Sequence, residues 1–62
     1  MTREEILIKS AAKLRVGAEE LARSHTLSGG VWGSDPEDGR AQKDHDETLE
    51  LADLLIAMAR PG

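Results

Sequence analysis

The sequence contains no cysteine, and its one aromatic side chain is Trp32. Without cysteine the chain can form neither a disulfide nor a thiolate zinc site, and two histidines are a poor ligand set for a structural metal. The absence of phenylalanine and tyrosine removes the usual bulky core residues and the aromatic rows on which single-stranded nucleic acids stack. We therefore expect no metal and no cofactor, and a fold stabilised by another route.

Clustered positive charge and long apolar runs are also missing. The net charge is −4, and the eight basic residues are scattered among twelve acidic ones, so we do not expect direct binding to nucleic acid. No stretch approaches the roughly 20 apolar residues of a membrane span, and residues 2–5 lack the features of a signal peptide. We expect a cytoplasmic protein that does not contact a membrane.

The first half of the chain has the pattern of a helix over about residues 3–25. Thr2 and Glu5 have the spacing of a capping box, which starts the helix at once. Six residues then follow in alternating steps of four and three, the spacing of a packed helix seam: Leu7, Ala11, Leu14, Ala18, Leu21 and His25. Gly17 lies beside this seam and costs the helix about 1 kcal/mol relative to alanine. We attribute Gly17 to close helix packing.

Residues 26–35, TLSGGVWGSD, interrupt this pattern with three glycines and two serines, and therefore form the connection. A flexible linker does not ordinarily expose a tryptophan, because its large ring is costly to leave in water. We expect Trp32 to fold back over the open end of a helical hairpin or into a neighbouring chain. The alternative is that Trp32 serves as a platform for a ligand.

A second helix is predicted over about residues 36–60. Ser34 or Asp35 offers an N-cap, Pro36 suits the first helical position, and Pro61 and Gly62 end the pattern. Because Gly39 and the polar residues after it specify the first turns weakly, the alternative is a short turn at 36–38 and a main helix from about Asp44.

Residues 47–60 carry more apolar surface than one neighbouring helix can cover. At 100° per residue, one stripe contains Leu49, Ala52, Ile56 and Ala59, and a second contains Leu51, Leu54, Leu55 and Met58. The sequence therefore predicts a single all-α unit over residues 1–62, an antiparallel two-helix hairpin with a loop at 26–35. Because so short a chain has a marginal core, we expect it to form a homo-oligomeric helical bundle, a dimer or larger.

The loop end holds the candidate ligand-binding residues. They combine a stacking face, hydrogen-bond donors, glycine amides and one positive charge: His25, Thr26, Gly29, Gly30, Trp32 and Arg40. This combination is typical of a pocket for a small anionic or base-containing ligand between subunits. The net negative charge opposes multiply charged ligands unless arginine is focused into the pocket. Under the alternative structural role, the same residues close the end of the hairpin.

Glu50 and Asp53, one turn apart, resemble the ExxD motif of the all-α MazG-like nucleoside triphosphate pyrophosphohydrolases. That resemblance implies a metal-dependent nucleotide hydrolase in which acidic side chains hold magnesium. The nearest match to the family's EExxE element, residues 19–23, ends in Arg23, whose charge opposes a metal. We do not expect an enzyme.

The chain as a whole is similar to small accessory proteins of bacteriophages and prophages. The features that carry this resemblance are the opening TREE helix, residues 24–26 (Ser-His-Thr), Trp32 and a polar run leading into a Leu/Ala-rich helix. The resemblance implies a protein of the host-cell cytoplasm that counters host defence, by sequestering a nucleotide-like signal or by binding a host protein. Three classes stay open: a binding module, a structural or assembly protein, and a nucleotide hydrolase.

Overall fold

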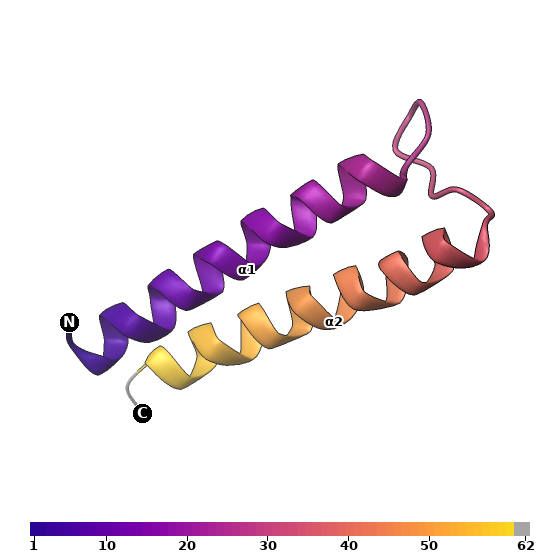
Figure 1. The fold of residues 1–62 in the computed structure, drawn as a ribbon. Coiled ribbons are helices and arrows are strands. Elements are labelled where there is room, and N and C mark those ends of the chain that lie inside the picture. Colours follow the sequence, from indigo (N-terminus) through magenta and orange to yellow (C-terminus); the bar gives the residue numbers. More distant parts are fainter. Residues whose placement is uncertain (61–62) are drawn as a thin grey trace.

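The computed structural model describes residues 1–60, which form two long helices packed side by side in antiparallel orientation (Figure 1). Helix α1 spans Arg3–His25 and helix α2 spans Pro36–Ala59. Together they make a rod of 41 × 17 × 16 Å. The predicted all-α hairpin is confirmed. Pro61 and Gly62, the predicted end of the second helix, lie outside the described residues. Within residues 1–60, neither helix is apolar enough over a sufficient length to cross a membrane.

Helix α1 begins where the capping pattern places it. The hydroxyl oxygen of Thr2 accepts a hydrogen bond from the amide of Glu5 at 3.1 Å, which satisfies one of the free amides at the helix start. All six residues of the predicted seam face α2 and are buried or half-buried, and Ala11 and Ala18 are at most 1% exposed. The spacing of four and three therefore identified the contact face of α1.

Helix α2 runs without interruption through Gly39, so the alternative of a short turn followed by a later helix is wrong. Asp35 is the N-cap residue, and its amide donates a hydrogen bond to Oδ2 of Asp38 at 3.2 Å. This bond and the fixed backbone of Pro36 stabilise the first turn, where the sequence has few apolar residues. Further along, Leu49, Ala52, Ile56 and Ala59 are buried or half-buried, as predicted for the first stripe.

Small side chains form the core between the helices. The buried residues among 1–60 are five alanines: Ala11, Ala18, Ala41, Ala52 and Ala59. Arg3 reaches the carbonyl of Met58 near the chain termini and His25 reaches Asp38 near the loop, so the region of Ala11 lies opposite that of Ala52. Alanine facing alanine lets two helix backbones approach closely, at the cost of burying little apolar surface.

The prediction for Gly17 is wrong for the packing of this hairpin. A Cβ atom added to Gly17 would have no atom within 4 Å, so contact between α1 and α2 does not require a glycine at this position.

Candidate functional site

The connection between the helices includes a narrow finger formed by residues 26–32 (Figure 1). Thr26 and Trp32 pair as a single antiparallel β-bridge at its base. Above them the amide of Leu27 donates to the carbonyl of Val31 at 2.6 Å. Gly29 and Gly30 turn the chain with φ values of 83° and 78°, a left-handed conformation that glycine adopts without strain. The finger is therefore an organised turn.

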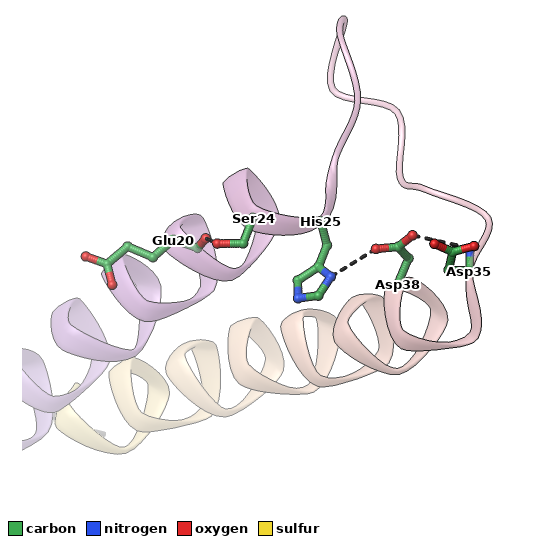
Figure 2. A network of polar contacts seen from close by, with 5 residues as sticks. All are labelled: Glu20, Ser24, His25, Asp35 and Asp38. Atoms are coloured by element: carbon green, nitrogen blue, oxygen red, sulfur yellow. Dashed lines mark hydrogen bonds and ion pairs between the residues drawn. The ribbon is translucent and has the colours of Figure 1, made fainter.

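A hydrogen-bonded network joins the two helices below the finger (Figure 2). Nδ1 of His25, at the end of α1, lies 2.9 Å from Oδ1 of Asp38 in the first turn of α2. The other carboxylate oxygen of Asp38 accepts the amide of Asp35, so this one side chain both caps α2 and ties it to α1. The His25 and Asp38 side chains are 26% and 17% exposed, which shields their interaction from water.

Gly33 completes the network from the loop. Its amide donates to the carbonyl of His25 at 3.0 Å, at the point where α1 ends. A Cβ atom at this position would overlap the carboxylate of Asp38, so only glycine fits without moving that side chain. A side chain at position 33 is therefore excluded by steric overlap, which the loop composition alone did not indicate.

Trp32 folds back onto α2, one of the two positions expected for it. The half-buried indole ring meets the ring of His45 edge-on, with centroids 5.2 Å apart and an interplanar angle of 65°. Such aromatic pairs contribute about 0.5–1.5 kcal/mol beyond the area they bury. His45 is held in turn by Asp46, whose Oδ1 lies 3.1 Å from the histidine Nδ1. Trp32 therefore contributes to the closed end of the hairpin, whether or not it also binds a ligand.

The six predicted ligand-binding residues are distributed over the loop and the start of α2. His25, Thr26 and Trp32 lie together at the base of the finger, whereas Gly29 and Gly30 are exposed near its tip. Arg40 is exposed on α2. The sequence predicts that the amide of Gly30 can bind an anion. In the structure this amide instead donates to the carbonyl of Leu27 at 3.1 Å. No enclosed pocket is present within residues 1–60.

Asp53, one of the two acidic residues considered for metal binding, has a different partner. Oδ1 of Asp53 lies 3.0 Å from the guanidinium of Arg15, in an exposed ion pair between α2 and α1. A magnesium ion at Asp53 would have to displace this positive charge. Over the described residues, no group of three or more acidic or histidine side chains is placed to share a metal.

Sequence reasoning missed Asp38, Gly33 and His45 as members of the loop-end cluster. A signal for Asp38 was present: it lies in the first turn of α2, which an antiparallel hairpin brings beside the last turn of α1. No comparable signal existed for His45, because its contact depends on the path of the loop. Comparison of the chain with protein-family models, curated proteins and solved structures finds no significant match.

Proposed function

We propose that this chain is a non-enzymatic binding module whose working unit is a homo-oligomer, a helical bundle built from two or more hairpins. The observation that supports it is the contrast between a core of five alanines and a surface on which nine large apolar side chains are at least 47% exposed. The exposed residues are Met1, Ile6, Ile8, Val16, Leu27, Val31, Leu51, Leu54 and Met58. Where such exposed apolar residues lie next to one another, they mark a site of interaction.

The energetics favour association for the same reason. Complete burial of a leucine, isoleucine or methionine side chain contributes about 1.5–3 kcal/mol, and a half-exposed side chain leaves about half of this unrealised. A chain of this length has a free energy of unfolding of only about 3–9 kcal/mol. Covering three or four of the exposed side chains therefore changes stability by an amount comparable with the total for one hairpin.

The target of the module is held at the loop end in this proposal. The residues assigned to binding are those predicted from the sequence: His25, Thr26, Gly29, Gly30, Trp32 and Arg40. The target class is a small nucleotide-like ligand or a host protein, bound without chemical change in the host-cell cytoplasm. Support for this class comes from the resemblance of the chain to phage accessory proteins that counter host defence.

Native mass spectrometry of the protein purified from its host tests stoichiometry and ligand together. The expected result is an oligomer whose mass exceeds the summed chains by that of a retained small molecule, or an oligomer with a second protein bound. An oligomer without bound ligand or protein would overturn the binding role and leave an assembly role. A monomer of about 7 kDa would overturn the proposal as a whole.

A structural or assembly role is the second candidate, favoured by the contact between Trp32 and His45. Trp32→Ala separates the two roles, with Val31→Ala as a matched control because Val31 is adjacent and 62% exposed. If Trp32 serves binding, its replacement abolishes retention of the target while the oligomer stays assembled. If Trp32 serves only the fold, Trp32→Ala dissociates or unfolds the oligomer, and Val31→Ala changes neither property.

A further inference from the structure

One strip of exposed side chains runs the length of α2. It consists of residues spaced alternately by four and three, all of them exposed: Arg40, Asp44, Glu47, Leu51, Leu54 and Met58. This α2 strip is charged in the half near the loop and apolar in the half near the chain termini. Leu51, Leu54 and Met58 are 47%, 55% and 54% exposed, so the apolar half is uncovered in the single hairpin.

The apolar half of the α2 strip is continuous with α1 on one flank of the rod. Asp53 meets Arg15 on the opposite flank, and at about 100° per residue Leu54 and Leu51 point well away from Asp53. On the strip's own flank, the guanidinium of Arg3 reaches the carbonyl of Met58. Ile6, one turn after Arg3 and 49% exposed, therefore extends the apolar surface beside Met58.

The charges along the α2 strip discriminate among the ways two copies can meet. A parallel pairing sets Glu47 against Glu47 and Asp44 against Asp44 of the other copy, which is repulsive. An antiparallel pairing over the whole strip sets Asp44 against Leu54 and Glu47 against Leu51. It therefore removes the two carboxylates from water and gives them no partner of opposite charge. An antiparallel pairing centred on Leu54 has neither defect, because Leu51 meets Met58 and both charged halves extend beyond the contact.

We propose that a second copy of this chain docks on the apolar half of the α2 strip and Ile6, antiparallel and centred on Leu54. This inference rests on the proposed homo-oligomer and specifies its interface. The contact is isologous, because each copy contributes the same residues. Glu47 then lies beside the end of the other hairpin where Arg3 carries positive charge. The contact covers only part of the 41 Å rod, so it buries less surface than a standard interface and is expected to be reversible.

Sedimentation of the full chain over a concentration series tests the surface. Leu54→Asp should raise the dimer dissociation constant by about 100-fold or more, because it places a charge at the centre of the interface. Val16→Asp is the matched control: Val16 is 55% exposed on α1 outside this surface, and the charge change is identical. Circular dichroism reports whether each variant remains helical. Dimerisation of Leu54→Asp with the affinity of the parent would overturn the interface and leave the oligomer proposal standing, whereas a monomeric parent would overturn both.

Disulfide trapping tests the register independently, since the chain has no cysteine of its own. In the proposed dimer Leu54→Cys crosslinks to itself under mild oxidation, and a mixture of Leu51→Cys and Met58→Cys crosslinks between the two variants. Met58→Cys alone does not crosslink, because the two copies of residue 58 lie about 10 Å apart along the axis, beyond disulfide reach. Efficient crosslinking of Met58→Cys alone, or none at Leu54→Cys, would overturn the antiparallel register.

Discussion

Replacement of Ala11 by leucine should destabilise the hairpin, because Ala11 is 0% exposed and lies in the region of α1 that faces Ala52, also 0% exposed. A leucine brings three additional carbon atoms to a point of the seam where both fully buried residues are alanines. Overpacking of a close-packed core costs about 1–3 kcal/mol. Against a total stability of about 3–9 kcal/mol, this is a large fraction.

The matched control is Ala12→Leu, one position along the same helix. Ala12 is exposed, so its replacement adds the same atoms where there is space for them. Alanine and leucine differ little in helix propensity, so stability should change by less than about 0.5 kcal/mol. The two variants therefore differ in the direction of one side chain, with composition and charge held constant.

Thermal unfolding followed by circular dichroism, at one fixed protein concentration, measures both variants. In a domain of this size 1 kcal/mol shifts Tm by about 4–8 °C, so Ala11→Leu should lower Tm by at least about 4 °C. The concentration must be the same for all samples, because association contributes to the apparent stability. Equal melting of Ala11→Leu and Ala12→Leu would refute the reasoning, since the helices would then not meet along the line of Ala11.

Three further substitutions test other parts of the structure. Gly33→Ala should lower stability by about 1–2 kcal/mol in urea unfolding, because its methyl group displaces the Asp38 carboxylate from the cap of α2; unchanged unfolding would argue against that contact. Gly17→Ala should raise the free energy of unfolding by up to about 1 kcal/mol, and Tm with it, because helix propensity improves and no atom lies within 4 Å of the added Cβ. A loss of stability would place another chain against Gly17. Leu55→Asp should abolish helical circular dichroism or dissociate the protein, because Leu55 is half-buried, whereas exposed Glu19→Ala should change stability by less than about 0.5 kcal/mol; a parent-like melt of Leu55→Asp would contradict the assigned helix phase.

The helices could be predicted because local signals determine them. Thr2 provides the cap of α1, Pro36 occupies the first position of α2, and apolar spacing marks the faces that meet. The continuity of α2 through Gly39 was less certain from sequence. It is supported by the hydrogen bond between Asp35 and Asp38 in the first turn, and by Ala41, which is 8% exposed and packs as part of the core.

The loop end was harder to predict because its contacts depend on chain path. That Trp32 would fold back was foreseen from the cost of exposing its ring, but its partner His45 depends on the geometry of ten connecting residues. The role of Gly33 is likewise set by the position of the Asp38 carboxylate. The packing reason assigned to Gly17 does not hold between α1 and α2, because proximity to a seam does not determine what lies next to a residue.

The alanine core also limits how the sequence of this hairpin can change over time. At most core positions of a protein, a substitution can either enlarge or reduce the side chain. At Ala11, Ala18, Ala52 and Ala59 almost every replacement is larger, so acceptable changes are confined to glycine, serine and alanine itself. Surface apolar residues carry no such restriction within one hairpin. Related chains should therefore be recognisable by small residues seven apart on each helix, even where their large apolar residues have been replaced.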